Sequence, residues 1–131
     1  YAVDIFPDHI IEFSTNAEEI YYKIDNIYLT RVITNVVKNG IQAIHHQDKK
    51  VKVEIENLQD RFFIKIQDNG NGISEENKDK VFEKKFTTKS TGMGLGLFMV
   101  KKIIEDYEGK IWFESIEDEG TTFFIEFLKK Y

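Results

Sequence analysis

The sequence predicts an α/β two-layer sandwich, in which one layer of helices covers one face of a largely antiparallel sheet. Apolar residues recur at helical spacing over residues 25–45 and 96–108. They alternate with polar residues, as in half-buried strands, over residues 51–57, 62–67, 110–115 and 121–128. Short connections join these strands in pairs, which favours antiparallel pairing. With 131 residues, we expect one domain over residues 1–131.

The first part of the chain contains short alternating stretches. Residues 3–5 and 11–13 predict a hairpin, and residues 20–22 predict a further short strand. The first long helix can be capped by Asp25 or Asn26. Its apolar stripe consists of Leu29, Val32, Ile33, Val36, Val37, Ile41 and Ile44.

The second part continues with strands and helices in alternation. The strand over residues 62–67 leads directly into Asp68, and a short helix is expected near residues 74–81. The second long helix begins at Gly96 and ends near Glu108. A closing hairpin then turns over residues 117–120.

Composition narrows the class of partner and the compartment. The chain is 41% hydrophobic and 31% charged, as in an ordinary soluble globular protein. It has no cysteine, which fits a reducing compartment. A net charge of -5 argues against a nucleic-acid partner, because phosphate backbones require a basic face.

No apolar run approaches the roughly 18 residues of a membrane span, so we expect a cytoplasmic domain without membrane contact. The start lacks methionine, so we expect a fragment of a longer chain, whose full length could be membrane-anchored.

Two glycine clusters lie at the ends of an unusually long connection between residues 68 and 96. The first follows Asp68 (DNGNG) and the second runs from Gly92 to Leu97 (GMGLGL). Glycine permits a positive φ and close approach of another molecule. Long connections in small domains are commonly lids or binding loops.

Each cluster has a chemical interpretation and a simpler alternative. The Asp68 carboxylate can accept a hydrogen bond from a ligand amine, or it can cap the following turn. The second cluster opens a helix, whose free N–H groups and dipole favour an anion such as phosphate. Its alternative is a flexible loop. The pattern is neither a Walker phosphate loop nor a Rossmann motif. Nearby cations and hydroxyls that could assist are Lys84, Lys85, Thr87, Thr88 and Lys89.

Asn35 and Asn39 lie one turn apart on the first long helix. Asparagine is unfavourable within helices, so a pair beside the apolar stripe points to a function. Amide oxygens are suitable ligands for Mg²⁺ that also binds nucleotide phosphates. The alternative is two solvated polar residues. The three histidines have no neighbours that indicate a nucleophile or a metal site.

Five motifs, in order, resemble those of the catalytic ATP-binding domain of bacterial sensor histidine kinases. Residues 35–44 (NVVKNGIQAI) resemble the N box, and residues 68–73 (DNGNGI) the first G box. Residues 81–89 (VFEKKFTTK) resemble the F box, residues 92–97 the second G box, and residues 120–123 (GTTF) the last strand motif. The resemblance implies the Bergerat ATP-binding fold, with a mixed, largely antiparallel sheet and a mobile ATP lid at about residues 83–95.

The resemblance also implies roles for individual residues. Asp68 would accept the adenine amino group with help from Thr121, and Asn39 would hold Mg²⁺ against the phosphates. Phe86 would help to order the lid. Asn35, Asn39 and Lys89 are the candidate catalytic residues. The candidate nucleotide-binding residues are Asn39, Asp68, Gly70, Gly72, Ile73, Phe86, Thr87, Thr88, Lys89, Gly92, Gly94, Leu95, Gly96, Leu97 and Thr121.

The implied function is donation of the ATP γ-phosphoryl group to a histidine in two-component signalling. The partner would be a dimerisation domain that carries this histidine, with a response regulator as an indirect partner. No segment here resembles that domain. Two further departures are Lys84 and Lys85 in the F box and Gly40 in the N box, where glycine costs about 1 kcal/mol of helix stability.

Three alternatives share the fold. One is an ATP-hydrolysing or mismatch-repair type ATPase, and another is a stand-alone serine kinase of the anti-sigma-factor type. Both resembling families place a glutamate where this chain has Asn35, which counts against them. The third is a pseudo-kinase that binds nucleotide without transfer, an alternative that the two lysines leave open.

Overall fold

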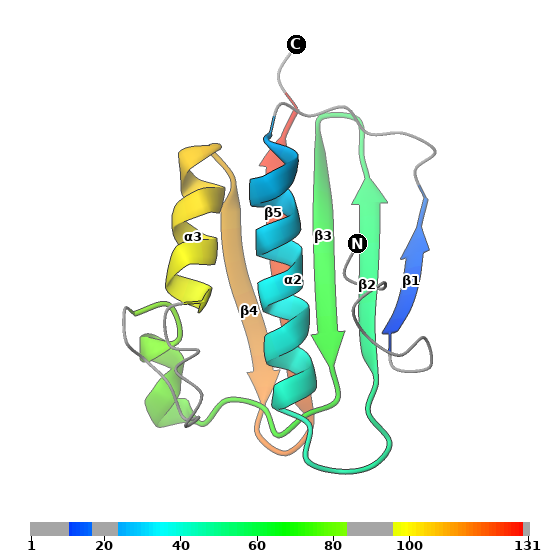
Figure 1. Cartoon of the computed structure of the whole chain (residues 1–131), viewed down its shortest axis with the longest axis vertical. Helices are drawn as coiled ribbons and strands as arrows, with labels where there is room; N and C mark the ends of the chain where they lie inside the picture. Colours follow the sequence, from blue (N-terminus) through cyan, green and yellow to red (C-terminus); the bar gives the residue numbers. More distant parts are fainter. Residues whose placement is uncertain (1–10, 17–23, 84–95, 130–131) are drawn as a thin grey trace.

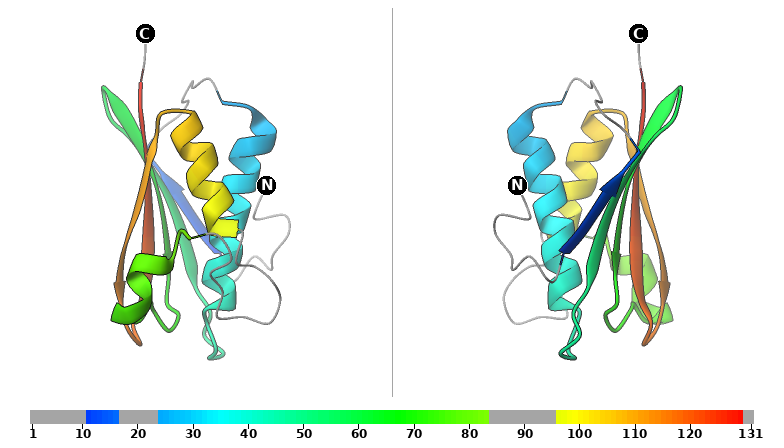
Figure 2. Two further views of the ribbon diagram at one scale, coloured as in Figure 1. Left: turned by 90° about the vertical axis from the view of Figure 1, so that its left-hand side faces the viewer. Right: turned by 90° about the vertical axis from the view of Figure 1, so that its right-hand side faces the viewer.

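A computed structural model describes residues 11–16, 24–83 and 96–129. Within these ranges a five-stranded sheet carries helices on one face only (Figures 1 and 2), which confirms the predicted two-layer class. The elements are β1 (Ile11–Thr15), α2 (Asn26–Gln42), β2 (Val51–Asn57), β3 (Arg61–Asp68), the 3₁₀ helix η1 (Glu75–Lys80), α3 (Gly96–Asp106), β4 (Lys110–Ile116) and β5 (Gly120–Leu128).

The strands lie in the order β1-β2-β3-β5-β4. The two predicted antiparallel pairs, β2 with β3 and β4 with β5, are confirmed, and β3 also pairs antiparallel with β5. β1 pairs in parallel with β2, with Ile11 opposite Val51, and this makes the sheet mixed. The predicted strand segments 3–5 and 20–22 lie outside the described residues.

The core lies between the sheet and the two long helices. Alternate residues of β3 and β5 point to the helices and are buried, as are the apolar stripes of α2 and α3. Full burial of such a side chain stabilises the fold by about 1.5–3 kcal/mol. The central members are Val32, Val36, Val37, Phe62, Ile64, Ile66, Val100, Ile103, Ile104, Phe123, Ile125 and Phe127.

α2 begins as predicted but ends earlier. Asp25 is the N-cap, and its carboxylate accepts a hydrogen bond from the Ile27 amide at 2.8 Å. The helix ends at Gln42 instead of continuing to residue 45, and the carbonyl of the following Ala43 accepts a hydrogen bond from Asn71 N–H. The end of α2 is therefore bound to the loop after β3.

Aromatic residues also lie on the sheet face that points away from the helices. Trp112 stacks on Phe124, with ring centroids 5.4 Å apart, and meets the edge of Phe63 at 6.4 Å. Trp112 is 38% exposed, so it packs against neighbouring strands and not in the core. No helix in the described part of the chain is long and apolar enough to cross a membrane.

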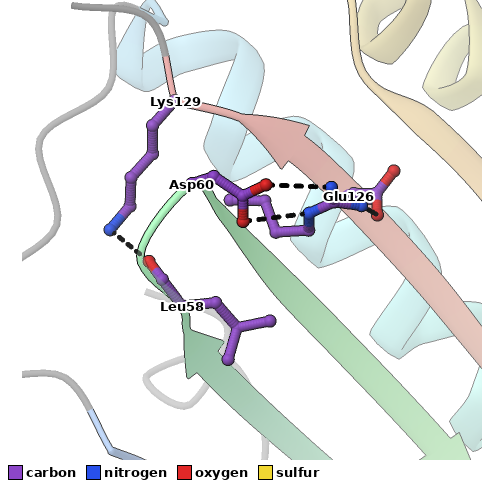
Figure 3. A network of polar contacts seen from close by, with 5 residues as sticks. Leu58, Asp60, Glu126 and Lys129 are labelled. Carbon is purple, nitrogen blue, oxygen red and sulfur yellow. Dashed lines mark hydrogen bonds and ion pairs between the residues drawn. The ribbon is translucent and has the colours of Figure 1, made fainter.

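A polar network joins the β2–β3 hairpin to β5 (Figure 3). The Arg61 guanidinium donates to both carboxylate oxygens of Asp60, at 3.2 and 3.0 Å, and to Glu126 Oε2 at 3.1 Å. Lys129 donates from Nζ to the carbonyl of Leu58 at 2.7 Å. These contacts lie at the opposite end of β3 from Asp68.

Candidate functional site

The candidate site is at the end of β3, where Asp68 lies directly opposite Thr121 of β5. Asp68 is 6% exposed, and its Oδ1 accepts hydrogen bonds from the Gly70 amide at 2.9 Å and the Thr121 amide at 3.3 Å. These two backbone donors fix the carboxylate. A charged acceptor is thus held at the edge of the core, between the sheet and α2.

Gly40 of α2 makes room for this carboxylate. A Cβ at position 40 would lie 3.2 Å from the Asp68 Cβ and 3.4 Å from its Oδ2. Contacts of 3.2 Å are tighter than ordinary van der Waals packing, so a methyl group would require Asp68 to shift. Glycine at position 40, which departs from the N box pattern and lowers helix stability, thus leaves the space that the Asp68 side chain occupies.

The glycines after Asp68 pack against backbone of the protein itself. A Cβ at Gly70 would lie 2.7 Å from the Ala43 carbonyl oxygen. Gly72 has a φ of 73°, and a Cβ there would collide with the Ile116 carbonyl oxygen. Both glycines therefore let the loop lie close to the end of α2 and to the β4–β5 turn. We also predicted that these glycines let an adenine ring approach the backbone, and this stays a prediction.

Asn69 joins this loop to the connection between α2 and β2. Its side chain accepts from the Lys50 amide at 3.0 Å and donates to the Asp48 carbonyl at 2.8 Å. The Nδ1 atom of His46 accepts a hydrogen bond from the Asp48 amide, so the ring proton is on Nε2. Nε2 then donates to the Asn69 carbonyl at 2.9 Å. His46 thus bonds to the loop after β3.

Ser115 belongs to the site and was missed from the sequence. Its Oγ lies 2.8 Å from Thr121 Oγ1 and accepts the Ile73 amide at 2.8 Å. Its carbonyl accepts a hydrogen bond from Lys78 Nζ at 2.9 Å, which ties η1 to the end of β4. The available signal was its position, because β4 alternates and Ser115 takes an inward place after Ile111 and Phe113.

The two asparagines of α2 lie at the same end of the helical layer. Asn35 Oδ1 is 3.8 Å from where a Cβ of Gly96 would be, so its side chain lies beside the first residue of α3. The first amides of a helix have no partner within the helix, and they carry the positive end of its dipole. Asn39 is half-buried next to Gly40, the residue that contacts Asp68. Leu97, the second residue of α3, is half-buried.

Amide oxygens of this kind suit Mg²⁺ in their chemistry. In the described ranges no three histidine, cysteine, aspartate or glutamate side chains group together as a metal cluster. The chemistry of the donors present, carbonyl oxygens of Asn35 and Asn39 beside a helix start, fits a hard cation that also binds phosphate.

Several predicted site residues lie outside the described residues, as does most of the predicted lid. They are Phe86, Thr87, Thr88, Lys89, Gly92, Gly94 and Leu95, together with Lys84 and Lys85. The segment leading to the predicted lid is anchored: Val81 is buried, and Phe82 packs against Phe113 and Phe123. Lys101 of α3 lies over the Phe82 ring at 5.1 Å.

The fold is a two-layer α/β domain with a buried carboxylate at the end of a central strand. A family model described as histidine kinase-, DNA gyrase B-, and HSP90-like ATPase matches residues 24–131. The chain belongs to this family. Figure 1 shows both long helices lying over the same face of the sheet.

Within this family, the chain is similar to sensor kinases. A probable C4-dicarboxylate sensor kinase of Halalkalibacterium halodurans is 42% identical over 106 residues, which are 78% of this chain and 20% of that protein. Sensor protein kinase WalK of Staphylococcus saprophyticus is 36% identical over 116 residues, 82% of this chain and 19% of that protein. The chain thus spans about a fifth of the length of these curated relatives.

Solved structures agree. The catalytic domain of histidine kinase ThkA superposes with a TM-score of 0.80 at 36% identity, covering 92% of this chain and 78% of that one. ThkA in complex with the response regulator TrrA gives a TM-score of 0.78 at 31% identity, covering 98% of this chain and 38% of that one. The chain is therefore a catalytic domain of the histidine-kinase type.

Proposed function

We propose that this domain binds Mg-ATP and donates the γ-phosphoryl group to a histidine on a separate dimerisation domain. The observation that carries the proposal is the buried Asp68 carboxylate, fixed opposite Thr121 at the end of β3 in a chain of the histidine-kinase type. A response regulator would receive the phosphoryl group afterwards. A solved complex of the related ThkA with a response regulator supports this kind of partner.

Adenine recognition would use the end of β3. Asp68 accepts a hydrogen bond from the 6-amino group, because its carboxylate is fixed by two backbone amides and has no proton to donate. Thr121 provides a second polar contact from β5. Gly70, Gly72 and Ile73 line the same loop.

Phosphate binding would use the start of α3. The N–H groups of its first residues, Gly96 and Leu97, and the positive end of the helix dipole would bind an anion. The lid at about residues 83–95 would close over the phosphates, with Phe86 ordering it. Further contacts would come from Thr87, Thr88, Lys89, Gly92, Gly94 and Leu95.

The metal would lie between the nucleotide and α2. Asn39 would supply an amide oxygen ligand to Mg²⁺, with Asn35 close by, and the ion would neutralise phosphate charge. Lys89 would add a positive charge from the lid. Phosphoryl transfer depends mainly on positioning and charge neutralisation, so these residues are sufficient for the donor side. Asn35 is an amide and not a carboxylate, which favours transfer to a protein acceptor over activation of water.

The test is the affinity of Asp68→Asn for a non-hydrolysable ATP analogue with Mg²⁺, measured by calorimetry. Asparagine keeps the shape but directs an amide donor at the adenine amine or at its own backbone donors. We expect affinity to fall roughly 10- to 100-fold, the range for a lost hydrogen bond to a charged group. Asp106→Asn, an exposed residue at the end of α3, is the matched control and should bind as the wild type. Near-normal binding by a folded Asp68→Asn would contradict the adenine assignment.

A further inference from the structure

The Ser115 side chain joins three segments around Asp68, which are β4, β5 and the loop after β3. Its Oγ contacts the Ile73 amide at 2.8 Å, Thr121 Oγ1 at 2.8 Å and the Gly120 carbonyl oxygen at 3.2 Å. The first partner belongs to the loop after β3, and the other two belong to β5. Ser115 itself is half-buried at the end of β4.

All three contacts at Ser115 can be hydrogen bonds at once under only one assignment of donors and acceptors. A serine hydroxyl has one proton and two lone pairs. The Ile73 amide can only donate, so it occupies one lone pair. The Gly120 carbonyl can only accept, so it takes the proton. The remaining lone pair then faces Thr121 Oγ1, and a hydrogen bond forms there only if Thr121 donates.

This assignment determines what Thr121 can offer to a ligand. With its proton directed to Ser115, the Thr121 hydroxyl presents only lone pairs elsewhere. Asp68, directly opposite and 6% exposed, is likewise an acceptor. The Asp68 and Thr121 side chains therefore both present acceptors, which attract an amino group and repel a carbonyl oxygen.

We propose that Ser115 is a positioning residue that holds the Thr121 hydroxyl as an acceptor and so selects 6-amino purines over 6-oxo purines. The proposal rests on the proposed nucleotide binding and adds a residue that sets its base preference. Ser115 acts through Thr121 and does not need to touch the base. Without Ser115, the Thr121 hydroxyl can rotate and donate a proton to a 6-oxo group.

A purely structural role for Ser115 makes a different prediction. If Ser115 only fastened Ile73 and Gly120, its loss would loosen the loop and weaken every nucleotide alike. The ratio of affinities for ATP and inosine triphosphate, which replaces the 6-amino group by an oxo group, distinguishes the two roles. The absolute affinity does not.

The experiment measures binding of ATP and of inosine triphosphate, each with Mg²⁺, by calorimetry. Wild type should prefer ATP, and Ser115→Ala should lower the preference about three- to tenfold, the size expected for one hydrogen bond. Ser74→Ala is the matched control, because the buried Ser74 Oγ has no hydrogen-bond partner among the described residues, and it should keep the wild-type ratio. An unchanged ratio in Ser115→Ala, or a wild type without preference, would overturn the proposal.

Thr121→Val provides a second route should Ser115→Ala not fold. It removes the hydroxyl but keeps the shape, and it should lower the ratio as much as Ser115→Ala does. Combining both changes should lower it no further, since they act through one group. An unchanged ratio in Thr121→Val would also overturn the proposal. A wild type that binds neither nucleotide would instead refute the proposed function itself.

Discussion

At the scale of single residues, Gly72 illustrates how backbone conformation supports the site. Its φ of 73° is a left-handed value that side chains disfavour, and its Cα faces the Ile116 carbonyl. The next residue, Ile73, donates its amide to Ser115. The conformation of one glycine thereby connects the loop after β3 with β4.

We expect Gly72→Ala to lower the free energy of unfolding by at least about 1–2 kcal/mol, the cost of a left-handed conformation with a Cβ. The collision with Ile116 adds to this cost. Urea denaturation measures the change. Gly96→Ala is the comparison, since the nearest atom of the described residues to a Cβ there is 3.8 Å away, and alanine in a helix should be neutral or stabilising by up to about 1 kcal/mol. Equal stabilities of the two variants would refute the backbone argument.

Site residues could be predicted from the sequence where they interrupt a regular pattern of apolar and polar residues or match a family motif. Asp68 stands out because a charged residue and glycines interrupt an apolar strand, and Thr121 follows from the family resemblance. Ser115 does not stand out, because one small polar residue within an alternating strand is common. Its role depends on Ile73 and Thr121, which only the pairing of three strands and a loop brings together.

At the scale of elements, alternation predicted the strands but not all their partners. β2, β3, β4 and β5 were predicted because their inward residues are consistently apolar and their connections are short. The parallel pairing of β1 with β2 was not predicted, because alternation does not specify the neighbour of a strand. The end of α2 was also missed. It is set by contacts of Ala43 with the loop after β3, which are distant in sequence.

The network on the β2–β3 hairpin makes stability depend on pH. The hydrogen bond from Arg61, aided by its charge, lowers the pKa of Asp60 below its ordinary value of 3.8. A carboxylate whose pKa is lower in the folded state than in the unfolded state stabilises the fold when it is ionised. This stability is fully present above the unfolded-state pKa and is lost as the pH falls through the folded-state pKa. Asp60→Asn should therefore be less stable than wild type near neutral pH, and the difference should shrink as the pH falls through the lowered folded-state pKa of Asp60.

Urea denaturation at several pH values checks this difference. In an Arg61→Met background, which keeps the aliphatic stem but removes the largest cause of the shift, Asp60→Asn should make a smaller pH-dependent difference. Added salt should reduce the effect in the wild-type background, because the pair is exposed and screened. A difference that persists at low pH would show that Asp60 stabilises the hairpin in another way.

At the scale of the whole molecule, the two polar clusters lie at opposite ends of one strand. β3 has eight residues, so at about 3.3 Å per residue Asp60 and Asp68 are roughly 25 Å apart. Between them lie the apolar core residues of β3, which pack with the rest of the sheet and both helices. Figure 2 shows the helices and the sheet as two layers. Changes separated by more than about 7–10 Å without shared partners are usually additive. The hairpin network and the candidate site should therefore contribute independently.

Ligand binding tests this independence. A ligand that binds only the folded domain raises the free energy of unfolding, by about 2.7 kcal/mol at a concentration 100 times the Kd. With a non-hydrolysable ATP analogue and Mg²⁺, Asp60→Asn should gain the same increment as wild type from a lower starting value, whereas Asp68→Asn should gain little at that concentration. Unfolding curves with and without the analogue give both quantities. A reduced increment in Asp60→Asn would mean that the hairpin is coupled to the site through β3, and that the sheet does not act as a rigid, additive support.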